Sequence, residues 1–505
     1  MSELSLDRLR RDGQAFMEAI SREFYLAHSG HKATAELQPL YDRYGAIMSD
    51  ESLALVLEAF RAAPDGSEEQ RGLRLLLDWQ AESQASRELA ALDEREIAWE
   101  AEAMLTLPDG SRVPFQRAAI DMANSTDRAH RLSLEAARAR LVEAELAPLR
   151  MEHFQREREI TERLGLARGY NATFDLLSGV PLMDLRGQCE QFLRDTQHIW
   201  DEVYPEFVKR ELGIAPGDAT RADALALMRG RQYDAAFPWE AMQPQILGQV
   251  RESGISPDAD GRITFDTGER EGKRSRAFCS PVRVPDEVYL VLRPHGGQAD
   301  WSTFLHELGH ALHFAYMAPD LAFEYRWLGD NSVTEGYAML FDHRLHDARW
   351  LARYTQLGTA DIARFLRSAG FEELQFLRRY CAKLIYETQL YGGDVAWSAL
   401  PDLYVQLLTG ATTFRYSRAD AFVDVDPRYY AARYLRAWQL QSVLAESLTE
   451  RFDEDWWRNP RCGPWMVEHL FGHGQRELAH EQAQRVAGRT LGFAPLVRAI
   501  ERMLG

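Results

Sequence analysis

Apolar side chains recur at three- and four-residue intervals over much of the chain, with polar or charged side chains between them. This spacing is typical of amphipathic helices, which complete a turn in about 3.6 residues. It is clearest over residues 51–63 and over the long run 129–164, which is rich in Ala, Leu, Glu and Arg. We expect the alternating Arg and Glu of the second run to form a solvated face with i,i+4 ion pairs. The chain is therefore predicted to be mainly α-helical.

Turn-forming residues interrupt the helical pattern at a few places. Residues 108–110 (PDG) separate two short β-prone runs, which predicts a small hairpin. Residues 253–261 are rich in Gly, Pro and Asp, and a strand-like run, EVYLVLR, follows at 287–293. We therefore expect two lobes, a mostly helical N-terminal lobe over 1–265 and a second lobe over 266–505 that contains a small β-sheet.

The length and the net charge of the chain limit the architectures and the partners that we expect. The chain has 505 residues, which exceeds the size of about 250–300 residues at which single cores stop growing and agrees with two lobes. Asp and Glu number 77 against 59 Lys and Arg, a formal net charge of −18. Such a surface repels a phosphate backbone, so we expect no nucleic-acid partner.

The remaining composition predicts a soluble, cytoplasmic protein. The four cysteines lie far apart with no CxxC pair, which favours reduced thiols in a reducing compartment. The first twenty residues are polar and charged and do not resemble a secretory signal. No segment approaches the 18–20 consecutive apolar residues that a membrane span needs, so we expect no membrane partner.

The most informative segment is WSTFLHELGHALHFAYM, which begins at Trp301 and contains the pattern HExxH. On a helix, His306 and His310 lie one above the other, so both imidazoles can reach a single metal ion. Neutral imidazole is a preferred zinc ligand, and catalytic zinc sites keep one position open for water. Glu307 projects beside such an ion, where its carboxylate can take a proton from that water. The pattern predicts zinc chemistry with Glu307 as general base.

A catalytic zinc site needs a third protein ligand. Glu335 lies 25 residues after His310 at the start of a helix-like pattern, and we favour it over Asp330 and Glu324. Asp342 follows about two turns later and could orient a ligand imidazole through a hydrogen bond.

Three further histidines lie close to these candidates in the sequence. His313 is expected to be a core or rim residue, with substrate contact as the alternative. His343 and His346 are expected to be solvated rather than functional.

Two motifs resemble those of one peptidase family. The segment HELGHALH at 306–313, with Glu335 beyond it, and GKRSRAFC at 272–279 are similar to the thimet oligopeptidase and oligoendopeptidase F family of zinc metallopeptidases. The resemblance is strongest over residues 265–345. It implies that His306, His310 and Glu335 bind one zinc ion per chain. It also implies a gluzincin-type, two-lobed helical fold with the small sheet beside the active-site helix and a central substrate channel.

The family also carries tyrosines, four residues apart, that stabilise the tetrahedral intermediate. Tyr430 and Tyr434 match this spacing at the start of a helix-like run. A phenol hydroxyl can donate a hydrogen bond where negative charge develops. The chain departs from the family pattern in two places, because VDVDPR at 423–428 replaces a His and a Gly-rich loop, and Ala437 stands where a further tyrosine is expected.

The resemblance also places the strand at 287–293 beside the substrate cleft. We expect an extended peptide to pair with an exposed edge of this strand, so that Tyr289 and Val291 contact the substrate. A site deep in a channel implies short, unfolded peptides as substrates. The expected activity is that of a zinc metalloendopeptidase acting on such oligopeptides.

Three alternatives stay open. The same chemistry could serve a carboxypeptidase or dipeptidyl carboxypeptidase, in which Arg433 or Arg436 binds a substrate carboxylate, although surface charge is the expected role of both. The departures from the family pattern would also fit a peptide-binding protein that retains zinc with little turnover. A metal-free structural helical protein is the third alternative.

Overall fold

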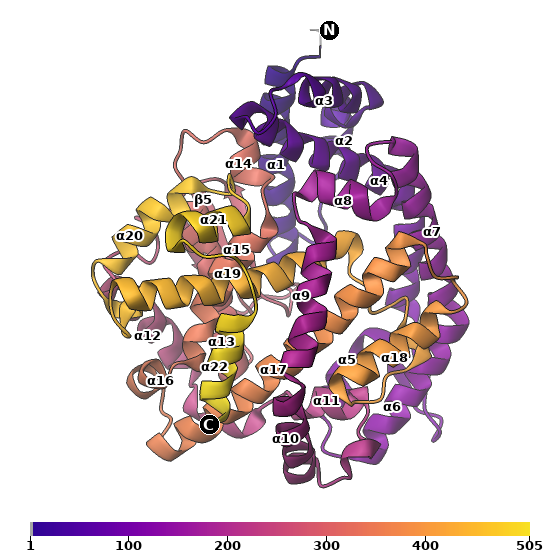
Figure 1. Cartoon of the computed structure of the whole chain (residues 1–505), viewed down its shortest axis with the longest axis vertical. Coiled ribbons are helices and arrows are strands. Elements are labelled where there is room, and N and C mark those ends of the chain that lie inside the picture. Colours follow the sequence, from indigo (N-terminus) through magenta and orange to yellow (C-terminus); the bar gives the residue numbers. More distant parts are fainter. Residues whose placement is uncertain (1–3) are drawn as a thin grey trace.

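The structure is a computed structural model, and it describes residues 4–505. It is mainly helical, as predicted, with the N-terminal helices at the top of the molecule and the C-terminal helices on the left (Figure 1). The N-terminal group consists of α1 (Leu6–His28), α2 (Gln38–Tyr44), α3 (Asp50–Ala62) and the long α4 (Glu68–Glu102). Helix α3 confirms the helix predicted over 51–63.

A second group of helices lies along the right side and the lower part of the molecule in Figure 1. The predicted hairpin is present, because β1 (Met104–Thr106) pairs antiparallel with β2 (Arg112–Pro114). The predicted run 129–164 forms two helices joined by a π-helical segment, Val142–Leu146. The helices of this group are α5 (Phe115–Asn124), α6 (Arg128–Leu141), α7 (Ala147–Leu164), α8 (Tyr170–Ser178), α9 (Leu182–Asp195), α10 (Gln197–Phe207) and α11 (Arg221–Leu227). Helix α12 (Trp239–Glu252) follows and lies on the left side of Figure 1.

A small sheet follows α12, as the change of pattern after residue 261 predicts. Its strands are β3 (Ile263–Asp266), β4 (Phe278–Arg283) and β5 (Glu287–Val291), in the order β3-β5-β4. Strand β5 is parallel to β3 and antiparallel to β4. Both edges of β5 are therefore occupied, so the expectation that a substrate pairs with an edge at 287–293 is wrong. The outer strands of this sheet are β3 and β4.

The helices after the sheet are α13 (Gln298–Ala315), α14 (Phe323–Trp327), α15 (Asn331–Asp342), α16 (Ala348–Tyr354), α17 (Thr359–Gly392), α18 (Leu400–Thr412), α19 (Tyr430–Arg451), α20 (Cys462–His469), α21 (Ala479–Ala487) and α22 (Ala494–Leu504). Helix α15 packs against both α13 and α19. The sheet lies beside α13, which contacts β4 and β5. These contacts bring the HExxH helix, the helix of Glu335 and the helix of the paired tyrosines together.

Two large apolar cores hold the molecule together. The first joins α9, α10, α17 and α18, and it stacks Phe371 of α17 on Trp200 of α10. The second joins α12, the sheet, α13, α15 and α20 around Trp301. Helices α17 and α19 contribute apolar side chains to both cores. The first core therefore combines residues from both sides of residue 265, and the lobe boundary there stays a prediction.

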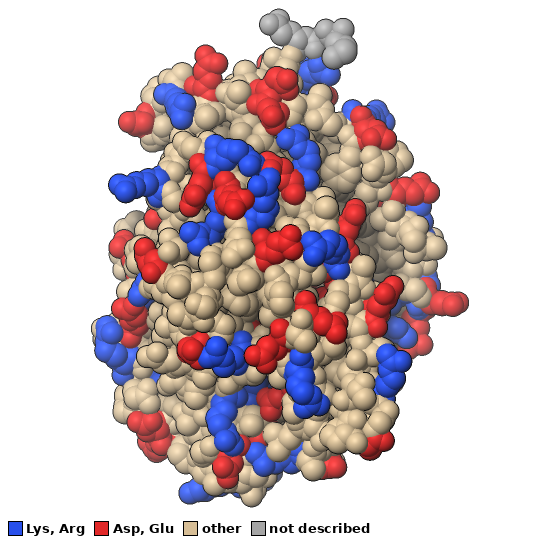
Figure 2. Space-filling view, turned by 90° about the vertical axis from the view of Figure 1, so that its right-hand side faces the viewer, with Lys and Arg blue, Asp and Glu red and all other residues tan. Residues whose placement is uncertain are grey.

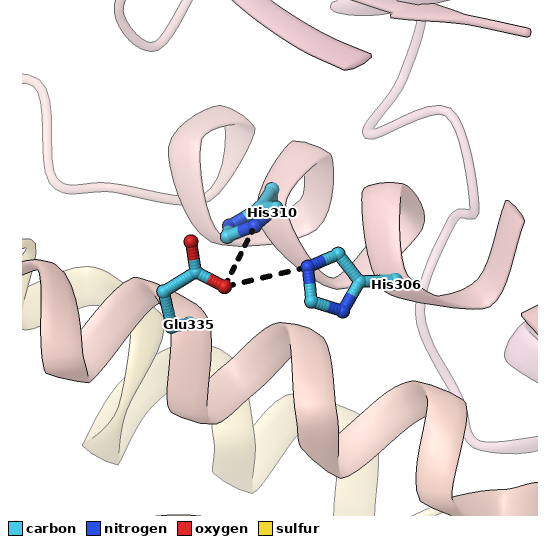
Figure 3. A group of neighbouring side chains, drawn as sticks. All are labelled: His306, His310 and Glu335. Carbon is cyan, nitrogen blue, oxygen red and sulfur yellow. Dashed lines mark ion pairs between the residues drawn. The ribbon is translucent and has the colours of Figure 1, made fainter. Parts of the chain in front are cut away.

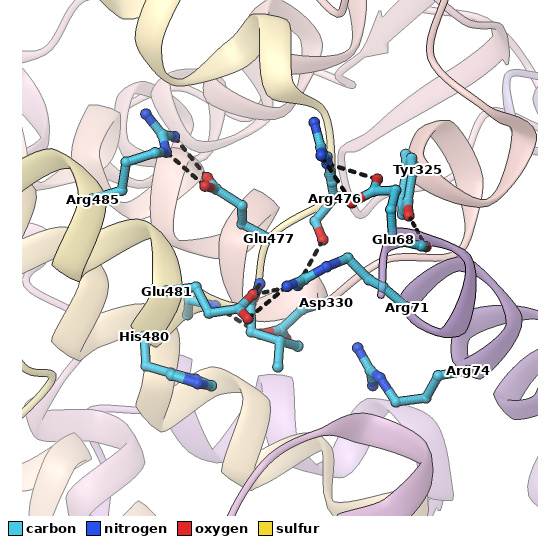
Figure 4. A network of polar contacts seen from close by, with 12 residues as sticks. Glu68, Arg71, Arg74, Tyr325, Asp330, Arg476, Glu477, His480, Glu481 and Arg485 are labelled. Atoms are coloured by element: carbon cyan, nitrogen blue, oxygen red, sulfur yellow. Dashed lines mark hydrogen bonds and ion pairs between the residues drawn. The ribbon is translucent and has the colours of Figure 1, made fainter. Parts of the chain in front are cut away.

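A network of ion pairs connects the start of α4 to the segment around α21 (Figure 4). Arg71 pairs with Glu481 at 2.5 Å, and Arg476 pairs with Glu68 at 2.8 Å. Next to this network, the backbone N–H of Ala479 donates to Asp330, whose side chain also caps α15. The contacts fix the N-terminal end of α15, the helix that carries Glu335.

Charges of both signs are interspersed on the face that Figure 2 shows. Ion pairs between α4 and α7, such as Arg156 with Glu88 and Arg95 with Glu152, also bring opposite charges together. The excess of acidic residues therefore does not produce one acidic patch on this face. Across residues 4–505, no helix combines the length and the apolar character needed to cross a membrane.

Candidate metal centre

Helix α13 carries both histidines of the HExxH pattern on one side, as its four-residue spacing predicts. The ring centroids of His306 and His310 lie 5.0 Å apart. Gly309 between them faces α15, where an added Cβ would lie 2.6 Å from the Cα of Ala338. Only glycine allows the two helices to approach this closely. The close packing brings Glu335 of α15 to the two imidazoles.

His306, His310 and Glu335 form one cluster, which we call the first cluster (Figure 3). Glu335 Oε2 lies 3.4 Å from His306 Nε2 and 3.7 Å from His310 Nε2. Tetrahedral bonds of about 2.0–2.2 Å to zinc separate neighbouring ligand atoms by about 3.3–3.6 Å. The three atoms are therefore spaced as ligands of one such ion.

The other ring nitrogen of each histidine has its own partner. His306 Nδ1 donates to Asp342 Oδ2 at 2.8 Å, and His310 Nδ1 shares a hydrogen bond of 2.8 Å with Thr334 Oγ1. Both partners belong to α15, so this one helix orients both imidazoles with Nε2 toward Glu335. The contact of Asp342 agrees with its predicted position. The role of Thr334 was not predicted, although the residue directly precedes Glu335.

The two carboxylate oxygens of Glu335 have different surroundings. The hydroxyl of Tyr430 donates to Oε1 at 2.5 Å. Oε2 is buried and has no hydrogen-bond partner among the described residues, although it lies between two imidazoles. A buried carboxylate oxygen without a partner is costly unless a cation or a donor is supplied. The donor set of two imidazoles and one carboxylate thus fits a zinc-type ion.

The environment keeps Glu335 ionised. Burial by itself would raise its pKa, but the neighbouring His306 and His310 and the hydroxyl of Tyr430 lower the pKa to about 2. Burial lowers the pKa of His310, because the charged ring would lose its hydration. The pKa of His306 is instead raised well above its ordinary value, because Asp342 and Glu335 outweigh the effect of burial, so this ring has to lose its proton when it binds a metal ion.

Glu307 lies next to the first cluster without belonging to it. Its side chain is partly exposed and has no hydrogen-bond partner among the described residues. Burial raises the pKa of the Cys279 thiol on strand β4, and the charge of Glu307 adds to this effect. Helix α13, which carries Glu307, contacts strand β4. Cys279 ends the GKRSRAFC segment, but its position beside the base was not predicted.

Tyr434 lies one helical turn after Tyr430 on α19. Its ring contacts those of Tyr430 and Trp438, with centroids 5.7 and 5.0 Å away. Burial and the charge of Glu335 raise its pKa, so the hydroxyl stays protonated. Together with Asp342, Tyr434 lines a cavity of about 220 Å³. Among the described residues its hydroxyl has no partner, so it is free to donate a hydrogen bond.

The side chains expected to contact substrate lie away from the first cluster. Tyr289 stacks on Tyr25 of α1 with ring centroids 3.8 Å apart, and Val291 is buried in the same apolar group. Both lie on the face of β5 opposite to Leu290, which belongs to the core around α13. Their substrate contact stays a prediction, and in this structure α1 covers both. His313 is fully buried, and burial lowers its pKa to about 3, as suits a core histidine.

The competing acidic residues have other partners. Asp330 caps α15, and Glu324 pairs with Arg10 at 2.9 Å. The expected surface position of Arg433 and Arg436 is wrong. Arg433 lies 3.4 Å from Asp78, and Arg436 is buried and donates to His480 at 2.9 Å.

The expectation that His343 and His346 are solvated is also wrong. The side chain of His343 is only 14% exposed and lies 3.0 Å from Glu373 of α17. With His346, these residues form a second group of metal-ligand type. Sequence spacing could not reveal it, because Glu373 comes from a helix that only tertiary packing brings close.

Neither a protein-family model nor a curated protein matches the sequence. The structure, by contrast, is similar to several solved structures along their whole length. The M32 carboxypeptidase from Deinococcus radiodurans R1 gives a TM-score of 0.61 at 14% identity, covering 99% of both chains. The Pyrococcus furiosus carboxypeptidase gives 0.65 at 13% identity with complete coverage of both chains. Trypanosoma cruzi metallocarboxypeptidase 1 gives 0.61 at 14% identity, covering 98% of this chain and 97% of that one.

These similarities establish the fold. The chain has the mainly helical architecture of these carboxypeptidases from end to end. The three structures are named as carboxypeptidases, whereas the sequence motifs resemble those of oligopeptidases.

Proposed function

We propose that this protein is a zinc-dependent metallocarboxypeptidase that removes residues from the C-terminus of short, unfolded peptides. The metal is supported chiefly by Glu335 Oε2, a buried oxygen without a hydrogen-bond partner 3.4 and 3.7 Å from two imidazole nitrogens. Removal of C-terminal residues, rather than internal cleavage, is supported by the full-length fold similarity to carboxypeptidases.

His306, His310 and Glu335 would hold the ion, as their spacing and donor chemistry allow. When bound, zinc acts as a Lewis acid toward water and the scissile carbonyl. Glu307 takes a proton from the attacking water and delivers it to the leaving amine. Tyr434 donates a hydrogen bond to the carbonyl oxygen as negative charge develops there.

A carboxypeptidase must also recognise a free C-terminal carboxylate. We propose Arg276 for this role. It is exposed in the segment before β4, and its charge lowers the pKa of Tyr430, although burial and Glu335 raise that pKa overall. Arg433 and Arg436 are less suitable, because both already have protein partners.

Internal cleavage of oligopeptides is the second candidate. It is favoured by the segments HELGHALH and GKRSRAFC, which resemble those of the thimet oligopeptidase and oligoendopeptidase F family. The two cleavage modes share the zinc site and the base. They differ in whether the substrate needs a free C-terminal carboxylate.

Peptide pairs with free and amidated C-termini separate these functions. We expect the zinc-loaded protein to shorten the free peptides stepwise from the C-terminus and to leave the amidated ones intact, as read by mass spectrometry. Internal fragments from both sets would support the endopeptidase instead. No cleavage by wild type, or equal cleavage by Glu307→Gln, would contradict both peptidase functions and leave a zinc-retaining binding protein as the alternative.

Arg276 can be tested within the same assay. Arg276→Ala is expected to raise KM about tenfold or more, since a charge-assisted hydrogen bond contributes about 1.5–3 kcal/mol. Arg274→Ala is the matched control, because Arg274 lies in the same segment but its charge acts on His28. Equal changes in both variants would argue against a specific role for Arg276.

A further inference from the structure

A second group of two histidines and one glutamate lies beyond the end of α15. It consists of His343 and His346 in the short 3₁₀ segment His343–His346 and Glu373 of α17, and we call it the second cluster. One ligand atom from each residue lies within 4.8 Å of the other two. Side chains three residues apart on a 3₁₀ helix lie above one another, and here the ring centroids are 4.6 Å apart. Both imidazoles can therefore serve one ion.

The second cluster is connected to the first through Asp342. Its Oδ2 accepts from His306 Nδ1 at 2.8 Å, and its Oδ1 accepts from His343 Nδ1 at 2.5 Å. The Nε2 of His343 consequently faces Glu373 Oε1 at 3.0 Å, just as the Nε2 of His306 faces Glu335. A metal-bound histidine usually has such an acceptor on its second nitrogen. Each cluster therefore contains a histidine whose Nδ1 donates to Asp342 and whose Nε2 faces a glutamate.

The second cluster is also accessible to an ion. His343, His346 and Glu373 line a cavity of about 750 Å³, and the same three residues border the cavity of about 220 Å³ that Tyr434 lines. The ring of His346 has no hydrogen-bond partner among the described residues. It is therefore free to bind an ion without losing an existing contact.

We propose that His343, His346 and Glu373 bind a second divalent metal ion of the zinc type, separate from the ion of the first cluster. Two imidazoles and a carboxylate suit zinc, cobalt or nickel better than calcium or magnesium, which prefer oxygen ligands. The ion takes the place of the hydrogen bond between His343 Nε2 and Glu373. This site is independent of the proposed peptidase activity.

The two clusters differ in the residue that follows the first histidine. In the first cluster, Glu307 follows the first histidine. In the second cluster, the residue after His343 is Arg344, whose guanidinium stacks on Phe341 with 3.7 Å to the ring centroid and bonds Gln249. The second cluster therefore lacks the HExxH pattern that places Glu307 next to the first cluster.

The site can be tested in a variant that lacks the first cluster. His310→Ala is expected to retain one zinc per chain after loading with Zn²⁺ and desalting, measured by elemental analysis. Adding His346→Ala should remove that zinc, and adding Glu373→Gln should lower its affinity. The control is His310→Ala with His198→Ala, an exposed histidine, which should retain the ion. Circular dichroism establishes that each variant is folded.

Loading with Co²⁺ gives a second readout, because its visible absorption bands depend on the ligands. We expect bands in His310→Ala that disappear in the double variant with His346→Ala. A folded His310→Ala that binds no ion would overturn the proposal, and so would an ion that persists in the double variant. Neither outcome depends on whether the wild type cleaves peptides, so this test is independent of the proposed function.

Discussion

The two His–His–Glu clusters share their ligand types and one carboxylate but differ in their surroundings. In the first cluster, the histidines lie four apart on α13 and Glu335 Oε2 has no hydrogen-bond partner. In the second cluster, the histidines lie three apart on a 3₁₀ segment, and Glu373 already bonds His343. A metal ion is therefore needed to satisfy the first cluster, whereas the second is partly satisfied without one.

The neighbouring residues separate the clusters further. Glu307 follows the first histidine of the first cluster, whereas Arg344 follows the first histidine of the second. Burial and the charge of the nearby Glu335 raise the pKa of Tyr434, and this tyrosine also lines the cavity that the second cluster borders. Ligand chemistry alone thus does not make a catalytic site. A base and a donor must also reach the same space.

The largest effect is expected at the base. Glu307→Gln should lower kcat about 10²- to 10⁴-fold, since general acid–base catalysis contributes that much, while zinc at the first cluster is retained. Glu373→Gln is the matched change in the second cluster and should leave kcat nearly unchanged. Steady-state kinetics and metal analysis of both variants check this. A larger loss of kcat in Glu373→Gln would contradict the division of roles.

Tyr434 and Tyr430 are expected to have different roles, the first in the reaction and the second in zinc binding. Tyr434→Phe is expected to lower kcat about 10²- to 10³-fold with unchanged zinc content, because it removes a hydrogen bond made to developing charge. Tyr430→Phe should instead weaken zinc binding, because Tyr430 donates to Glu335 Oε1. Zinc affinity and kcat, measured on both variants, separate the roles. Equal changes of kcat and zinc affinity in the two variants would contradict these separate roles.

The first cluster was largely predictable from the sequence, and the second was not. HExxH places its histidines through the local geometry of one helix, and Glu335 begins a recognisable helical pattern. Glu373 lies 27 residues after His346 on another helix, so only the packing of α17 brings it to the cluster. Parallel pairing of β3 with β5 is equally non-local, which is why the central position of β5 was missed.

Close packing of α13 on α15 distinguishes the first cluster and can be disturbed separately. Gly309→Ala should reduce the free energy of unfolding by about 1–3 kcal/mol, since the added Cβ would meet backbone atoms of α15. Gly248→Ala in α12 is the control, because nothing lies within 4 Å of its added Cβ. It should be neutral or stabilising by about 0.4–1 kcal/mol. Denaturant unfolding of both variants measures the difference.

Asp342 links the clusters, so its replacement is expected to affect both. In Asp342→Asn, one of the two imidazole N–H groups would face an amide NH₂ instead of an oxygen, which disturbs the orientation of that ring. We expect zinc affinity to fall about 10- to 100-fold, as for other partners of metal-binding histidines. Thr334→Val is the matched control. Thr334 bonds only His310, so this variant should weaken zinc binding at the first cluster alone. Zinc titrations in the His310→Ala background measure the affinity of the second cluster, and titrations in the His346→Ala background measure that of the first. If Asp342→Asn left the second cluster unaffected, the two sites would not be coupled through this carboxylate.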